Sequence, residues 1–346
     1  MTPTVEIRGR LMGDGRPVYI LAEMACAHDG SPEKAKRLID AAKAAKADGV
    51  QLQFFCTDEL VTPNNKIHSL LKRIELDREQ WRDIHAHARQ SGLDVWACTF
   101  DLPSVALAGE LGVDGIKLNS SDLASPDMIR AVSALGIPFT LGTGASTLEE
   151  IAQALDVARE AGGEDIVLMH GVQNFPTALK DANLKRIKLL RSLFPNCVGY
   201  ADHTDASLPE AKVIDLTALG MGACLLEKHI TLDRSEKGVD YQAALEPQEL
   251  KEYVAAVRGV ETGLGSDALR PLTESDKQYR KFQKKSIVAA RDLTAGQAIT
   301  GDTVRFLRTG GTPAIPPSRF SELDGRILKE GVSAMTPIKM EHLAES

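Results

Sequence analysis

The strongest constraint on the fold is a regular alternation of eight short apolar runs with amphipathic segments of helical spacing. The runs are VYILAEM (18–24), GVQLQFF (49–55), DVWACTF (94–100), GIKLNSS (115–121), PFTLGTG (138–144), DIVLMHGV (165–172), CVGYADHT (197–204) and ACLLEKHI (223–230). The segments between them carry helix-start signals, such as Ser31 before Pro32 and Thr147 three residues before Glu150. Strands that alternate with such helices pair in parallel, and eight units close into a barrel. We therefore predict an α/β fold, a (β/α)8 TIM barrel. The alternative is an open doubly wound sheet, but no GxGxxG follows the first strand.

The pattern changes after the last of these units. Residues 269–286, LRPLTESDKQYRKFQKKS, are polar and basic, and the pieces beyond them, such as SIVAARDL and AITGDTVRFLRTG, are β-like and broken by glycine and proline. We expect a barrel domain over 1–266, a linker over 267–285 and a small β-rich domain over 286–346. A domain of that size has little core of its own, so we expect it to pack against another surface.

Charge and cysteine content exclude several classes of protein. The net charge is −7 and no local cluster of Lys and Arg interrupts it, which argues against a nucleic-acid partner. Five scattered cysteines without CxxC spacing indicate a reducing compartment. No apolar run approaches the roughly 20 residues of a membrane span, and the start MTPTVEIRGR has no signal-peptide core. We expect a soluble, cytoplasmic protein that binds neither nucleic acid nor membrane.

Polar side chains gather at the ends of the predicted strands, where barrel enzymes carry their active sites. They are Glu23, His28, Gln51, Gln53, Cys98, Lys117, Ser120, Asp122, Thr143, His170, Gln173, Asp202, His203, Glu227 and His229. A single strand histidine is most often a hydrogen-bonded structural residue, but His203 and His229 end neighbouring strands and would converge. Two neutral imidazoles suit a divalent transition metal whose shell is completed by water and substrate oxygens. We therefore predict a metal at this pair.

Lys117 and Glu23 each allow more than one interpretation. Lys117 lies in an otherwise apolar strand, and three interpretations are open. It could pair with a buried carboxylate, anchor a phosphate or carboxylate of a ligand, or act as a Schiff-base amine. Glu23 is a general acid/base or an acceptor for a sugar hydroxyl, since an unpaired buried carboxylate is costly. The Gly-Thr-Gly at 142–144 resembles an anion cradle, and Cys98, which has no identified basic partner, is interpreted as a packing residue.

Seven motifs, in the same order along the chain, resemble the sialic acid synthase family of phosphoenolpyruvate-dependent nonulosonic acid synthases, including the spore-coat polysaccharide type. The motifs are ILAEMACAHDG, IKLNSSD, PFTLGTGA, HGVQNFPT, YADHT, LEKHIT and KGVDYQAALEP. The C-terminal piece KKSIVAARDLTAGQAITGDTVRFLRTG is similar to that family's antifreeze-like (SAF) domain. The resemblance implies a TIM barrel, a domain-swapped homodimer, and condensation of phosphoenolpyruvate with an open-chain amino-sugar aldehyde resembling N-acetylmannosamine.

The resemblance also implies roles for individual residues. His203 and His229 would hold a divalent cation, usually Mn²⁺, with Mg²⁺ or Co²⁺ as alternatives. Glu23, Lys117 and Arg308 would be catalytic, and Arg308 would reach the active site of the other subunit. The substrate-binding residues would be Gln53, Ser120, Asp122, Thr143, Gln173, Asp240 and Arg308.

Several positions depart from the family's pattern and cluster around the phosphoenolpyruvate pocket. They are Gln51 for lysine, Cys98 for threonine, Gly142 and Ala201 for serine, Ala27 for asparagine, and Gln173 for asparagine or serine. Loss of one cation and several hydroxyls predicts weaker binding of a trianion. Two other interpretations are a Schiff-base aldolase that uses Lys117 and a catalytically silent sugar-binding or structural homologue. The joint presence of Glu23, Lys117, His203, His229 and Arg308 argues against the silent homologue.

Overall fold

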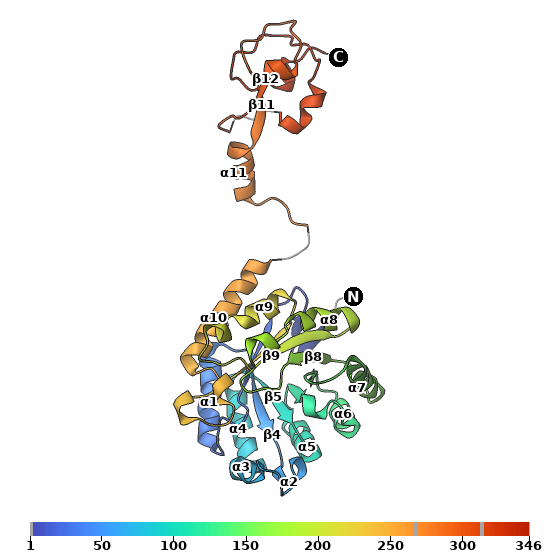
Figure 1. The fold of residues 1–346 in the computed structure, drawn as a ribbon, viewed down its shortest axis with the longest axis vertical. Helices are drawn as coiled ribbons and strands as arrows, with labels where there is room; N and C mark the ends of the chain where they lie inside the picture. Colours follow the sequence, from blue (N-terminus) through green and yellow to red (C-terminus); the bar gives the residue numbers. More distant parts are fainter. Residues whose placement is uncertain (1–2, 266–268, 312–314, 346) are drawn as a thin grey trace. The chain divides into compact units, whose positions relative to one another are not determined.

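Eight parallel strands close into a barrel, which confirms the predicted TIM fold (Figure 1). The strands are β3 (Tyr19–Glu23), β4 (Gly49–Phe54), β5 (Asp94–Thr99), β6 (Gly115–Leu118), β7 (Phe139–Gly142), β8 (Ile166–Gly171), β9 (Cys197–Asp202) and β10 (Leu225–His229). They pair in chain order, and β10 returns to β3, where His229 is opposite Glu23. The structure is a computed structural model that describes residues 3–265, 269–311 and 315–345. Each barrel strand lies within one of the eight predicted runs.

Helices follow the strands and surround the barrel (Figure 1). They are α1 (Pro32–Ala45), α2 (Thr57–Leu60), α3 (His68–Ile74), α4 (Arg78–Ser91), α5 (Leu102–Leu111), α6 (Pro126–Ser133), α7 (Leu148–Glu160), α8 (Lys185–Leu193), α9 (Ile214–Gly220) and α10 (Pro247–Leu264). The two predicted caps are present. The side chain of Ser31 accepts a hydrogen bond from the Lys34 backbone N–H at 3.2 Å, and Thr147 and Glu150 form a reciprocal capping box.

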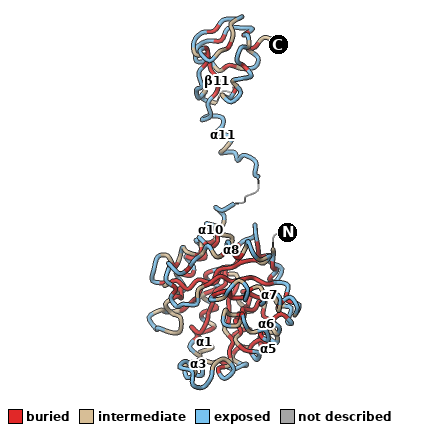
Figure 2. The backbone as a smooth tube through the Cα atoms, turned by 45° about the vertical axis from the view of Figure 1, so that its right-hand side comes forward, coloured by how far each residue is buried: buried red, intermediate tan, exposed pale blue. Residues whose placement is uncertain are grey.

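Residues of β3 alternate between two apolar cores, because successive side chains of a strand point to opposite faces. On β3, Ile20 and Ala22 belong to the core between the strands and the helices, whereas Tyr19 and Leu21 belong to the core inside the barrel. Figure 2 shows the strands as the buried centre of this unit. Apolar side chains from β3 therefore fill both the interior of the barrel and the layer between its strands and helices.

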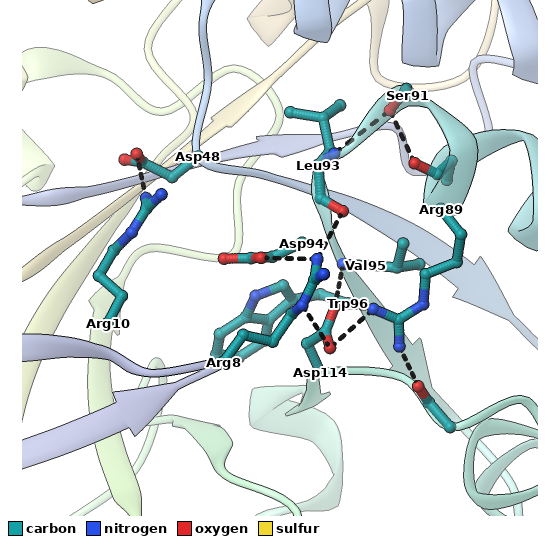
Figure 3. Close-up of polar contacts among 12 residues, drawn as sticks. Arg8, Arg10, Asp48, Arg89, Ser91, Leu93, Asp94, Val95, Trp96 and Asp114 are labelled. Atoms are coloured by element: carbon teal, nitrogen blue, oxygen red, sulfur yellow. Dashed lines mark hydrogen bonds and ion pairs between the residues drawn. The ribbon is translucent and has the colours of Figure 1, made fainter.

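A two-stranded hairpin, which the sequence did not predict, covers the amino ends of the barrel strands. It consists of β1 (Thr4–Ile7) and β2 (Arg10–Gly13), and its apolar side chains join the core inside the barrel. Its arginines form ion pairs with carboxylates at the starts of β4, β5 and β6 (Figure 3): Arg10 with Asp48, and Arg8 with Asp94 at 3.2 Å and Asp114 at 3.7 Å. The hairpin therefore closes part of the amino end of the barrel, opposite the strand ends that carry the predicted site residues.

The chain divides into two compact units, Met1–Ser266 and Asp267–Ser346. The second unit contains α11 (Glu274–Gln283), the antiparallel pair β11 (Lys285–Ala289) and β12 (Val304–Arg308), and its own small apolar core. Helix α11 occupies much of the segment expected as a linker, and it begins at a capping box of Thr273 and Asp276. Within the described residues, no helix is long and apolar enough to cross a membrane.

Candidate active site

His203 and His229 lie together at the carboxyl ends of two adjacent strands. His203 directly follows β9 and His229 is the last residue of β10, and their ring centroids are 5.0 Å apart. Glu227 is two residues before His229 and points to the same side of the strand. One potential ligand atom from each of the three lies within 4.8 Å of the others. The structure therefore adds a carboxylate to the predicted pair.

The donor atoms of this cluster suit a divalent cation. The Nδ1–H of His203 donates to the Val172 carbonyl at 2.7 Å, which leaves Nε2 of that ring with its lone pair. Among the described residues, the buried Nε2 of His229 and Oε2 of Glu227 have no hydrogen-bond partner. Burial lowers the pKa of both imidazoles, and they are neutral at physiological pH. Two neutral imidazoles and a carboxylate, with ligand atoms otherwise unsatisfied, fit such a metal.

Lys117 lies between two buried carboxylates inside the barrel. Its Nζ is 2.5 Å from Glu227 Oε1 and 3.6 Å from Glu23 Oε2. Burial disfavours the charge on Lys117, but attraction by Glu227 and Glu23 outweighs this effect and raises its pKa. Lys117 is therefore an ammonium ion that neutralises one of the two carboxylates.

Glu23 is completely enclosed by barrel residues. Its Oε1 accepts a hydrogen bond from the Ala25 backbone N–H at 2.5 Å, and its Oε2 accepts one from the Gln51 side-chain amide. Burial raises the pKa of Glu23 to about 8; Lys117 opposes the rise and Glu227 adds to it. A lysine at position 51 would have supplied a second cation here. With Gln51 in its place, Glu23 holds a proton at neutral pH.

Ser120 explains one of the departures from the family pattern. Its Oγ accepts hydrogen bonds from the Gly144 backbone N–H at 3.1 Å and from Gln173 Nε2 at 3.2 Å. A Cβ added at Gly142 would lie 2.6 Å from both the backbone nitrogen and Oγ of Ser120. In this arrangement only glycine fits at position 142. The neighbouring Thr143 hydroxyl donates to the Met169 carbonyl at 3.0 Å.

A cavity of about 570 Å³ adjoins the histidine pair. Phe175 lines it, and the ring of Phe175 lies 4.2 Å from that of His203 and 5.6 Å from that of His229, measured between centroids. The predicted sugar-binding residue Asp240 lies in the same wall, and burial raises its pKa. Asp240 therefore shares a cavity with Phe175, whose ring packs against both histidines of the cluster.

The remaining predicted residues lie farther out or in the other unit. Gln53, on β4, donates to the Cys26 sulfur at 3.2 Å, and Asp122 accepts from the Ser121 hydroxyl at 2.8 Å. Cys98 is buried, and burial raises its pKa, in keeping with a packing residue. Arg308 is exposed at the end of β12, paired in register with Lys285 of the C-terminal unit.

Sequence reasoning named Glu227 among the polar residues at the strand ends but gave it no part in the predicted metal pair, and it missed Phe175. Alternation along β10 offered a signal for Glu227, because it has the same parity as His229. Phe175 lies in a loop after β8, and no periodic pattern marked it.

Comparison with known proteins gives the same assignment along nearly the whole chain. The sequence profile of the NeuB family matches residues 38–268, and that of the SAF domain matches residues 284–344. An N,N'-diacetyllegionaminic acid synthase of Legionella pneumophila is 32% identical over 349 residues, covering 96% of each chain. The crystal structure of an N-acetylneuraminic acid synthetase of Leptospira borgpetersenii superposes with a TM-score of 0.75 at 28% identity, over 81% of this chain and 97% of that one. A putative spore coat polysaccharide biosynthesis protein E of Chromobacterium violaceum shares the fold, with a TM-score of 0.81 at 24% identity, over 95% of this chain and 100% of that one.

Proposed function

The chain belongs to the NeuB family of sialic acid synthases, and from this premise we propose that it condenses phosphoenolpyruvate with the open-chain aldehyde of an amino sugar. The products are a nonulosonic acid and phosphate. One observation carries the proposal: His203, His229 and Glu227 form a buried cluster with unsatisfied ligand atoms beside the Lys117 ammonium. An electrophile and an anion can therefore be held side by side at the mouth of the barrel.

The cluster is proposed as the metal site, with Mn²⁺ as the usual ion of the family. A divalent cation bound there would polarise the aldehyde carbonyl. His203 is oriented for this task by its bond to the Val172 carbonyl, and Phe175 shields the outer side of both rings from water. Asp240, on the cavity wall, would accept hydrogen bonds from sugar hydroxyls, and Gln53 and Asp122 are proposed for the same substrate.

Lys117 and Ser120 are proposed to bind phosphoenolpyruvate. The Lys117 ammonium would attract its carboxylate or phosphate, and the hydroxyl of Ser120 and the amide of Gln173 would donate hydrogen bonds. Thr143 contributes through the Gly-Thr-Gly backbone, since its hydroxyl hydrogen is already used by Met169. The donor end of the site has fewer cations than the family pattern provides, because position 51 is a glutamine.

Glu23 is proposed as the proton carrier. C3 of phosphoenolpyruvate attacks the aldehyde carbon, water adds at C2, and phosphate leaves by cleavage of the C–O bond. With a pKa raised to about 8 by burial, Glu23 begins the cycle protonated and can give a proton to the reacting substrates. Its carboxylate can then take a proton from the water that adds at C2.

The charge state of Lys117 disfavours the Schiff-base aldolase. A lysine must lose its proton to attack a carbonyl, whereas the two carboxylates raise the pKa of Lys117. Borohydride should therefore trap no adduct at Lys117 in the presence of substrate.

The C-terminal unit is proposed to complete the site of a second copy of the chain in a domain-swapped homodimer. Arg308 is the residue proposed for this role, because its side chain is exposed on β12. A guanidinium delivered to the sugar end would be able to bind hydroxyl or carboxylate oxygens.

A phosphate-release assay tests the proposal. Phosphoenolpyruvate is combined with a panel of hexosamines and their N-acetyl derivatives in ¹⁸O-labelled water, and the products are analysed by mass spectrometry. We expect phosphate release only with both substrates present, phosphate free of ¹⁸O, and loss of activity with a chelator or in Glu23→Gln. Phosphate release without consumption of any sugar, or ¹⁸O in the phosphate, would contradict C–O cleavage and the proposed reaction.

A further inference from the structure

Two buried cysteines lie together at the opposite end of the barrel from the candidate active site. Cys197 begins β9, and Cys224 immediately precedes β10, which pairs with β9. The Cys224 backbone N–H donates to the carbonyl of Val198, the residue next to Cys197, at 2.9 Å. Both side chains belong to the apolar cluster inside the barrel, and the Cys197 thiol donates to the Pro3 carbonyl at 3.2 Å. The β9–β10 register places Cys224 opposite Val198, one residue along from Cys197. With strands about 4.8 Å apart and a rise of about 3.3 Å per residue, such a diagonal pair has a Cα separation of roughly 6 Å, which a disulfide can bridge.

The pair is next to a cavity and an arginine. Cys224 lines a cavity of about 420 Å³ whose wall also contains the loop from Gly13 to Val18. The guanidinium of Arg191 is fixed by hydrogen bonds to the Gly222 carbonyl at 2.9 Å and to Asp14 Oδ2 at 2.8 Å. Its positive charge acts on both thiols. Small polar oxidants therefore have a route to a thiol pair that lies beside a cation.

We propose that Cys197 and Cys224 form a reversible dithiol–disulfide modification site, with a hydroperoxide as the oxidant. The Cys197 thiolate attacks one peroxide oxygen, the O–O bond breaks, and a sulfenic acid and water are formed. The Cys224 sulfur then attacks the Cys197 sulfur, and the sulfenic oxygen leaves as a second water. Overall, two thiols and one hydrogen peroxide give one disulfide and two waters. The bridge joins the amino ends of the two strands whose carboxyl ends carry His203 and His229.

Cys197 is the attacking residue because its surroundings favour the thiolate. The neighbouring Cys224 thiol lowers the pKa of Cys197; burial and Asp14 oppose this effect, and Arg191 reinforces it. Thiolates are the reactive form of cysteine towards oxidants. The other three thiols do not share this arrangement: burial raises the pKa of Cys26, Cys56 and Cys98.

Peptide mapping of the full-length protein tests the proposal. The native protein is treated with hydrogen peroxide, quenched in acid, alkylated, and digested with trypsin without reduction. Cys197 and Cys224 fall in different tryptic peptides, 192–212 and 213–228. We expect these two peptides joined with the loss of two hydrogens, and released again by dithiothreitol. Either Cys197→Ser or Cys224→Ser should remove the linked species, Cys56→Ser should leave it unchanged, and Arg191→Gln should slow its formation several-fold.

Two results would overturn the proposal. One is full alkylation of both peptides after unfolding under conditions in which Cys56 is oxidised. The other is linkage of either peptide to a different cysteine, or to a second chain on a non-reducing gel. Because wild-type protein is compared before and after oxidation, neither result depends on whether a variant folds.

Discussion

Lys228 is the residue whose replacement should reveal most about how the barrel holds its histidines. Its side chain is fully buried and lies 2.9 Å from Asp215 Oδ2; it also forms an ion pair with Asp202 and donates to the Ala211 carbonyl at 2.6 Å. Asp202 immediately precedes His203, and Lys228 immediately precedes His229. The network therefore joins the two strand ends that carry the cluster.

Lys228→Met removes the cation and leaves two carboxylates in a low-dielectric site. Breaking a buried pair in this way costs about 3–5 kcal/mol of the free energy of unfolding. At about 2–4 °C per kcal/mol for a domain of this size, the melting temperature should fall by roughly 6–20 °C. The matched control is Lys212→Met, which breaks the solvent-exposed pair with Glu252 at 3.0 Å and should cost about 1 kcal/mol or less.

Thermal melting followed by circular dichroism is the assay, repeated over a range of pH. In Lys228→Met the two carboxylates have pKa values above those in the unfolded chain, so the variant binds more protons when folded. Its deficit relative to wild type should therefore shrink as the pH falls. Adding Asp202→Asn and Asp215→Asn should recover part of the loss. If Lys228→Met melts together with Lys212→Met at every pH, the buried network contributes little and the reasoning is refuted.

Four further predictions concern the site itself. Activity should fall as the pH rises through about 8, because the protonated form of Glu23 is lost, and a pH–rate profile of kcat that lacks this limb would contradict Glu23 as the donor. Gln51→Lys should tighten phosphoenolpyruvate by a charge-assisted hydrogen bond of about 1.5–3 kcal/mol, measured as KM; weaker binding would indicate a pocket rebuilt for another donor. His203→Ala should abolish Mn²⁺ binding, measured by calorimetry, while the barrel stays folded. Retained stoichiometric Mn²⁺ binding would show that His203 is not a ligand. Finally, Arg308→Ala and Glu23→Ala chains, each inactive alone, should regain activity when they are refolded together. One site of the mixed dimer then carries both an intact Glu23 and an intact Arg308. No recovery of activity from properly assembled mixed dimers would argue against the domain swap.

The barrel could be predicted because its strands are buried on both faces. Such strands appear as continuous apolar runs, and each barrel strand falls inside one of the eight that the sequence displays. The hairpin of β1 and β2 was not predicted. Its strands are only four residues long and mix apolar with polar or charged residues, a pattern that surface loops also show. Helix α11 did have a signal, Thr273 followed three residues later by Asp276, but the polar and basic composition of this segment predicted a linker instead.

For the site, the sequence predicted which residues lie at the strand ends, because this depends only on residue type and strand position. His203 and His229 end adjacent strands, so their convergence follows from the topology. The orientation of side chains does not. The hydroxyl of Thr143 donates to a backbone carbonyl, and the close approach of Ser120 to Gly142 depends on the packing of two loops. Likewise, the proton on Glu23 depends on how three charged groups share one buried space.

The hairpin that covers the amino ends of the strands also affects the order in which parts of the barrel fold. Its apolar residues join the same interior cluster as Leu225, which lies more than 200 residues farther along the chain. Its arginines, in addition, require the starts of β4, β5 and β6 to be assembled before they find their carboxylates. Contacts so distant along the chain form slowly, because loop closure must precede them. The hairpin should thus be among the last parts of this unit to reach its native place, and until then the partly built barrel exposes its hydrophobic interior to chaperones and proteases.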